Sequence, residues 1–178
     1  MNCSKTAFAF IISAFVIIVI GCSNSGINNF GSLGSAHKHA DVKIYVSGDA
    51  IDISQQKYQL KSDLVHFENF DGDVVHVHTT GMNLGYMLKT LGMKIDENCL
   101  KLDTGKEYCS SEKGNLKVYV KGHDLEWEKI NSSASYIIHD LDRILITYGS
   151  ESEQGIKKQM ESVTKKALEA AEESGHED

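Results

Sequence analysis

Apolar and polar residues alternate along several short stretches of the chain, which is the pattern of β-strands that bury one face. Small and polar residues interrupt the alternation at 47–50 and again at 121–124, where the chain is expected to turn. The alternation predicts strands over 42–47, 51–54, 116–120, 125–127 and 144–148. Because these strands are short and turns separate them, a sheet is the core of the predicted fold.

The segment 65–78 predicts a β-hairpin with a different kind of side chain on each face. Val65 and Phe67 share one face of the first strand, as two valines do on the second. Both apolar sets reach the same core only with a three-residue loop, 70–72, because a two-residue loop would turn histidines inward. That loop places Gly72 at its last, left-handed position. The resulting register pairs Val65 with Val77, Phe67 with Val75 and His66 with His76.

The same register gathers polar side chains on the exposed face of the hairpin. His66 and His76 pair directly, with β-carbons roughly 5 Å apart, and His78 lies two residues further along the same face. Glu68 shares the parity of His66, so it is expected to bind a metal directly or to hold an imidazole by a hydrogen bond. This arrangement is typical of metal ligands.

A second His-x-His motif, formed by His37 and His39, precedes the first predicted strand. Alternate residues of a strand face one side, so both imidazoles of such a motif point the same way. The two motifs meet if the first strand is central in the sheet, and the sequence alone leaves this open. All-imidazole coordination favours Cu(II) or Zn(II). The alternative is a solvated sheet face, or histidines that bond to the backbone.

Two stretches show helical instead of strand periodicity. Apolar residues recur at helical spacing between 84 and 91, where Asn83 can cap the helix and Gly92 can end it. Gly85 weakens this helix, so close packing against a strand is expected there. A second amphipathic pattern predicts a helix over 152–173, either docked on the domain or solvated. Its mixed Lys and Glu residues are not typical of a membrane-binding helix.

Cys99 and Cys109 flank a segment that predicts a second hairpin, with its turn at Thr104 and Gly105. The hairpin brings the two sulfurs close together, so a disulfide is expected outside the cytoplasm. A structural crosslink is the simpler interpretation. Thiol–disulfide exchange is the alternative, although the chain lacks the CxxC motif in which redox-active thiolates usually occur.

The N-terminal sequence predicts export. Residues 7–20 form an apolar run that is too short to cross roughly 30 Å of hydrocarbon but suits a signal peptide. Residues 19–22 resemble a lipoprotein signal box in which Cys22 becomes the lipidated N-terminus; the alternative is an ordinary signal peptide with a chance cysteine. We therefore expect a signal peptide over 1–21, a flexible linker over 22–36, and a lipid anchor on the extracytoplasmic face of the cell membrane.

Charge and the order of elements narrow the class of protein. The net charge of −7 argues against nucleic acid as a partner. The sequence contains no phosphate-binding loop, dinucleotide motif or GxSxG elbow, so an enzymatic role is not favoured. Strands, one helix and further strands predict an α+β fold with a β-grasp-like mixed sheet and one packed helix over 37–150. A charged helical tail follows over 151–178.

Several motifs, taken in order, resemble a family of small exported or lipid-anchored proteins from archaea and some bacteria. Its members share a His-x-His-Ala start, a histidine-bearing hairpin, a Thr-Leu-Gly helix and an Asp-Leu-Asp-Arg-Ile-Leu-Ile-x-Tyr-Gly close. The matching stretches here are 37–40, 75–78, 83–85 and 140–149. The helix and last strand also look like β-grasp modules that bind small ligands, such as relatives of the cobalamin-carrier C-terminal domain. Here Asn83 replaces the expected Thr, and the tail lacks the cysteines of relatives. Some members are labelled disulfide isomerases, but the missing tail cysteines and the absence of a CxxC motif argue against that label for this chain.

These observations favour a lipid-anchored extracytoplasmic protein that binds copper or zinc for buffering, delivery or sensing. The expected metal ligands are His37, His39, His66, Glu68, His76 and His78. Two alternatives stay open: thiol–disulfide exchange through Cys99 and Cys109, and a metal-free β-grasp module that binds a small ligand or an exported protein partner.

Overall fold

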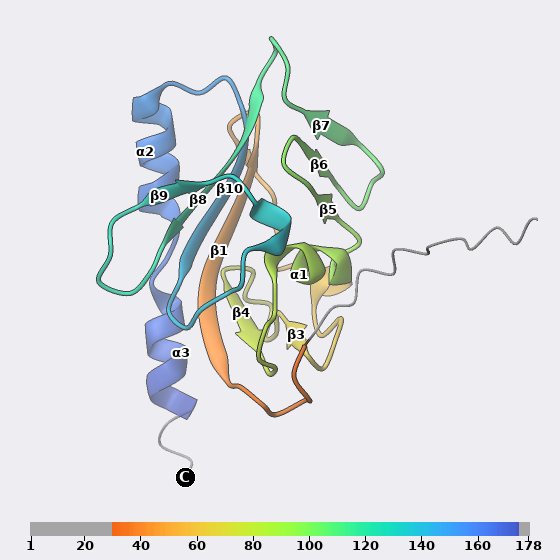
Figure 1. Ribbon diagram of the computed structural model, residues 1–178, viewed down its shortest axis with the longest axis vertical. Helices are drawn as coiled ribbons and strands as arrows, with labels where there is room; N and C mark the ends of the chain where they lie inside the picture. The colour runs from red at the N-terminus through yellow and green to blue at the C-terminus, as the bar shows by residue number, and fades with distance from the viewer. Residues whose placement is uncertain (1–29, 175–178) are drawn as a thin grey trace, which may run out of the picture.

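Three of the five alternating stretches form strands of one mixed sheet, which has helices on both of its faces (Figure 1). The computed structural model describes residues 30–174. The fold class is α+β, as the sequence predicted. The predicted signal peptide over 1–21 and the lipidation residue Cys22 lie outside the described residues.

Strand β1, Lys38–Val46, lies in the middle of the main sheet. It pairs in parallel with β10, Arg143–Gly149, and antiparallel with β4, Val74–Val77. Beyond these two neighbours each further strand is antiparallel to the one beside it. β3 (Val65–His66) pairs with β4, β8 (Asn115–Lys121) pairs with β10, and β9 (Glu128–Ile130) pairs with β8 at the edge of the sheet. A short strand β2, Asp49–Ala50, folds back onto the end of β1.

Side chains of β1 point alternately to the two faces of the sheet, and each face packs against a different part of the molecule. Ala40, Val42 and Ile44 point into the main hydrophobic core, which the helix α1 covers on one face of the sheet. Tyr45 points to the opposite face, where Leu145 packs against the first C-terminal helix. His39 and Asp41 share the parity of Tyr45, so they also belong to this second face. The histidines therefore lie on the side of the sheet that the C-terminal helices cover.

Helix α1, Leu84–Thr90, begins and ends where the sequence predicted. The side chain of Asn83 accepts a hydrogen bond from the backbone N–H of Tyr86 at 2.8 Å, and Gly92 takes a φ of 76° just after the helix. The expected packing of Gly85 against a strand is wrong. A β-carbon there would lie 2.8 Å from the carbonyl oxygen of Ala134, in the 3-10 turn η2, Ser133–Ser135.

A separate small sheet carries the two cysteines. It consists of β5 (Lys94–Ile95), β6 (Cys99–Lys101) and β7 (Glu107–Cys109). Cys99 pairs directly with Cys109 across the predicted hairpin, and their sulfurs form a disulfide. Gly105 has a φ of 83° in the connecting turn, as the sequence indicated.

Two predicted strands are displaced because local turns compete with the sheet. The segment 51–54 does not form a strand, since the carboxylate of Asp52 accepts a hydrogen bond from the N–H of Ser54 at 3.0 Å. A 3-10 turn, η1 (Gln56–Tyr58), follows. The segment 125–127 is also irregular, because the turn at Asp124, with a φ of 59°, extends further than expected. The strand β9 begins only at Glu128.

The predicted tail helix over 152–173 is two helices, α2 (Glu153–Ser162) and α3 (Lys166–Ser174). Two charged residues on neighbouring strands, Asp41 and Arg143, form hydrogen bonds with the segment where the two helices meet. Arg143 donates to the carbonyl of Thr164 at 2.9 Å and to that of Val163, near the end of α2. Asp41 accepts the N–H groups of Lys166 at 3.0 Å and of Ala167 at 3.2 Å, so it caps the start of α3. The tail is thus docked on the second face of the sheet.

The last residues of the predicted linker are part of the folded structure. Phe30 packs edge-on against Tyr86, with ring centroids 4.7 Å apart. The N–H of Gly31 donates to the carbonyl of Thr80 at 2.9 Å, and that of Gly34 donates to the carbonyl of His78 at 2.8 Å. These contacts fix the chain just before the first His-x-His motif.

Candidate metal centre

The registers of three neighbouring strands align three histidines across the sheet. His39 on β1 is opposite His76 on β4, and His76 is in turn opposite His66 on β3. The pairing of Val65 with Val77 and of His66 with His76 is the one that the sequence predicted. The sequence left open whether His37 and His39 meet the hairpin histidines. They do, because β1 begins at Lys38 and pairs with β4 of the hairpin.

All five predicted histidines lie in one cluster. His37 and His78 stand just outside the ends of β1 and β4, and their ring centroids are 5.2 Å apart. Ring centroids of the other neighbouring pairs lie 4.7–5.8 Å apart: His37 and His39, His39 and His76, His66 and His76, and His66 and His78. The cluster is therefore continuous from the edge strand to the central strand.

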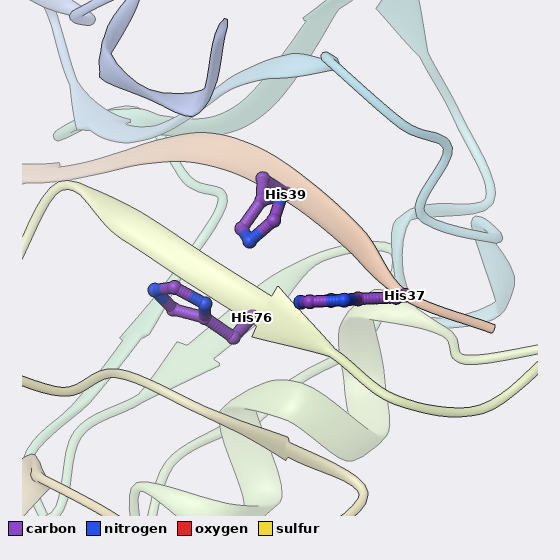
Figure 2. A group of neighbouring side chains, drawn as sticks. All are labelled: His37, His39 and His76. Carbon is purple, nitrogen blue, oxygen red and sulfur yellow. The ribbon is translucent and has the colours of Figure 1, made fainter. Parts of the chain in front are cut away.

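Three of these imidazoles converge on a common space, as Figure 2 shows. One ring nitrogen from each of His37, His39 and His76 lies within 4.8 Å of the other two. His39 is only 3% exposed, His76 is half-buried and His37 is exposed. The three rings thus form a site that is closed at its inner end and open to solvent at the His37 end.

Glu68 lies beside the edge of the cluster. Its carboxylate oxygens are 3.3 Å from Nε2 of His66 and 3.8 Å from Nε2 of His76. Nδ1 of His66 lies 2.9 Å from the carbonyl oxygen of Ser62 and donates to it, because a carbonyl can only accept. Nε2 is consequently the ring atom of His66 that is directed at Glu68 and at the cluster. The carboxylate of Glu68 can accept a hydrogen bond from an imidazole N–H, or it can bind a metal together with the imidazoles.

Burial keeps the inner histidines neutral. Desolvation lowers the pKa of His76 to about 4, and the neighbouring His39, His66 and His78 act in the same direction, while Glu68 partly opposes them. Burial is also the main cause that lowers the pKa of His39, with the charge of His37 next, and it lowers the pKa of His78. Neutral imidazoles have a free lone pair, which is the form that binds a metal.

The loop that carries Glu68 differs from its prediction. Residues 67–73 connect β3 to β4, so the loop is longer than the three residues expected. The left-handed positions belong to Asn69 and Phe70, each with a φ of 56°, and not to Gly72. Gly72 is required for space instead, because a β-carbon would lie 2.4 Å from the backbone nitrogen of Ser54.

A cavity of about 500 Å³ adjoins the three converging histidines. Its other wall comes from helix α3, which contributes Lys166, Glu169 and Ala170. This wall was not predicted, since the tail sequence shows only an ordinary amphipathic pattern. The loop residues Glu68, Asn69 and Asp71 line the cavity as well.

The predicted disulfide and the other two described histidines, His123 and His139, lie away from the cluster. Cys99 is half-buried and Cys109 is exposed, and their mutual disulfide leaves neither sulfur as a thiolate for a metal. His123 and His139 are exposed and lie beside the carboxylates of Asp124 and Asp142.

No family model, curated protein or solved structure matches the chain. Among residues 30–174, no helix has the length and apolar character needed to span a membrane.

Proposed function

We propose that the protein binds Cu(II) or Zn(II) through the histidine cluster. The observation that carries the proposal is the convergence of His37, His39 and His76, whose nitrogens lie within 4.8 Å of one another. Three imidazoles are a strong ligand set for either ion, and Cu(II) is the tighter by the usual affinity order. His66, Glu68 and His78 complete the proposed ligand shell, as direct ligands or by orienting the other rings.

The site needs only small movements to hold a metal. Ligand nitrogens around a tetrahedral zinc are roughly 3.3 Å apart, given zinc–nitrogen bonds of about 2.0–2.1 Å. His37 is exposed and precedes β1, so its side chain can close the remaining distance. His39 and His76 are fixed by the sheet. Two rigid ligands and one adaptable ligand suit a protein that takes up and releases its ion.

Binding is favoured over catalysis in this proposal. A hydrolytic zinc site needs an open coordination position and a base beside it. Glu68 is the only carboxylate paired with the histidine rings within the described residues, apart from the exposed pairs of His123 and His139. Because it already faces two imidazoles, it is better placed to orient ligands than to activate water. Buffering, delivery or sensing of the ion is the corresponding role.

The location and the fold type are part of the same proposal. Lipidation at Cys22 would anchor the protein on the extracytoplasmic face, where a disulfide is stable and exported protein partners are available. A β-grasp arrangement is supported by the central β1, which is parallel to the last strand and antiparallel to β4, with α1 packed on one face. We also propose that the protein belongs to the family of small exported or lipid-anchored proteins that its sequence resembles. The motifs at 37–40, 75–78, 83–85 and 140–149 support this membership.

Thiol–disulfide exchange is a second candidate because of one specific observation. Cys109 is exposed, so an external thiolate can reach its sulfur. If the protein exchanges disulfides, a small dithiol should reduce the Cys99–Cys109 disulfide rapidly under native conditions. Slow reduction that requires unfolding would leave the disulfide as a structural crosslink.

The test of metal binding is titration of the full chain, in a mild detergent, with Cu(II) and with Zn(II). We expect saturation near one equivalent, and loss of that binding in His39→Ala/His76→Ala. The matched control is His123→Ala/His139→Ala, which removes the same number of histidines from exposed positions and should bind as the wild type does. Equal affinity of the two double variants would refute the proposed site.

A further inference from the structure

We propose that helix α3 is a closing wall of the metal cavity, so that metal binding and docking of the C-terminal helices stabilise each other. This inference rests on the proposed metal site. Lys166, Glu169 and Ala170 of α3 line the same cavity of about 500 Å³ as His37, His39 and His76. Part of the site is therefore supplied by a segment that is distant in sequence from every proposed ligand.

The attachment of α3 consists mainly of polar contacts, which can open without exposing a large core. Its start is held by the carboxylate of Asp41, which accepts from the N–H groups of Lys166 and Ala167 and from the hydroxyl of Thr164. Within the described part of the helix, Ala167 is the buried apolar residue, while Leu168 is 43% exposed. Such an element belongs to the less stable end of a folded protein.

Lys166 connects α3 to the loop that carries Glu68. Its ammonium group lies 3.0 Å from Asp71 and 3.0 Å from Asp73. Asp71 in turn holds the loop together, because its backbone N–H donates to the carbonyl of Glu68 at 2.9 Å. A single lysine thus joins the wall helix to the loop carrying the carboxylate that faces the histidines.

The loop itself has a reason to move when that connection is lost. Asn69 and Phe70, which directly follow Glu68, both adopt left-handed backbone angles; asparagine tolerates this conformation, whereas a bulky residue such as Phe70 avoids it. The N–H of Phe70 is held by Gln59 at 3.0 Å, and the ion pairs of Lys166 restrain the far end of the loop. Release of Lys166 therefore allows Glu68 to shift away from His66 and His76.

Thermodynamic linkage makes this coupling measurable from both sides. If docked α3 improves the affinity for the ion by some factor, the bound ion must favour docking over opening by the same factor. Lys166 is partly exposed, with 44% of its side chain accessible, so its ion pairs are screened. We expect its loss to weaken affinity by roughly fivefold, the effect of about 1 kcal/mol.

The test combines hydrogen exchange with metal affinity in the full chain. Zn(II) is expected to slow amide exchange over 166–174 in the wild type. Lys166→Gln is expected to speed exchange there without metal, and to raise the zinc dissociation constant in a chelator competition. Lys157→Gln is the matched control, because Lys157 is an exposed lysine on α2, which does not line the cavity. Asp41→Asn is a second variant that weakens the cap of α3 and should act in the same direction.

The outcomes separate this inference from the proposed function. Histidine-dependent zinc binding that leaves exchange over 166–174 unchanged, with Lys166→Gln binding as the wild type does, would overturn the coupling and leave the metal site standing. Absence of histidine-dependent binding would overturn both. Protection of α3 by zinc together with weaker binding in both variants would establish that the helix closes the site.

Discussion

The acid sensitivity of the metal-free protein should depend on His76. Burial lowers the pKa of this histidine to about 4 in the folded protein, whereas an unfolded histidine titrates near 6.5. Between these two values the unfolded chain binds the proton and the folded chain does not. The contribution of His76 to stability is therefore fully present above pH 6.5 and is lost as the pH falls toward 4.

The magnitude follows from the two pKa values. Lowering the pH from about 7.5 to about 4.5 should reduce the free energy of unfolding by about 2–3 kcal/mol through His76 and its interactions with the neighbouring histidines. The side chain is only 16% exposed, so solvent screening does not remove this effect. Asp41 and Asp142 act in the opposite direction, because burial raises the pKa of each carboxyl group and acid then favours the folded state. Comparison with a variant that lacks His76 separates the contribution of this histidine to the pH dependence of stability from the contributions of Asp41 and Asp142.

The assay is urea unfolding of metal-free wild type and His76→Gln at both pH values. Glutamine keeps a polar side chain at the position but does not titrate. We expect the wild type to lose about 2–3 kcal/mol more than the variant on acidification, with unchanged m-values. His123→Gln removes an exposed histidine and should follow the wild type. Equal losses in wild type and His76→Gln would refute the argument that the cluster is held neutral at the expense of stability.

Three further predictions concern the elements that position the site. Replacement of Asn83 by Ala should lower the free energy of unfolding by about 1 kcal/mol in denaturant unfolding, because the cap of α1 is lost. Gly85→Ala should destabilise despite its better helix propensity, since the new methyl group would lie 2.8 Å from the carbonyl of Ala134; a higher melting temperature would contradict this. Loss of the Cys99–Cys109 disulfide in a double serine variant should lower stability by about 3 kcal/mol, the entropy of a loop with a separation of 10 residues, and should leave metal affinity unchanged.

The sequence predicted the parts of the site that depend on strand parity. The pairing of Val65 with Val77 requires only that apolar residues face one core, and a slip by one residue would have buried histidines on that side. The convergence with His39 was not predictable, because it depends on which strand lies beside β4 and on how early β1 begins. Neither feature leaves a periodic signal in the sequence.

The errors in the tail have their physical origin in interactions between distant residues, unlike the errors at 51–54 and 125–127, where local turns prevent the predicted strands. The helix break at 163–165 follows from Asp41 and Arg143, which lie far away in the sequence but next to each other in the sheet. The tail pattern alone could not show that these two residues would bind the helix ends. The wall of the cavity was missed for the same reason, since α3 reaches the histidines only because Asp41 fixes where it begins.

The cost of the cluster is itself an argument for its function. A sheet face that needs only solubility is served by residues that stay hydrated, whereas His39, His76 and His78 are desolvated enough to lower the pKa of all three. Their burial makes the metal-free fold less stable in acid and gives no apolar packing comparable to that of the opposite face. An ion that binds the folded state alone would offset this loss, since stability rises with ligand occupancy. Groups whose arrangement opposes stability are expected where function requires them, and here two of the three, His39 and His76, line the cavity next to α3.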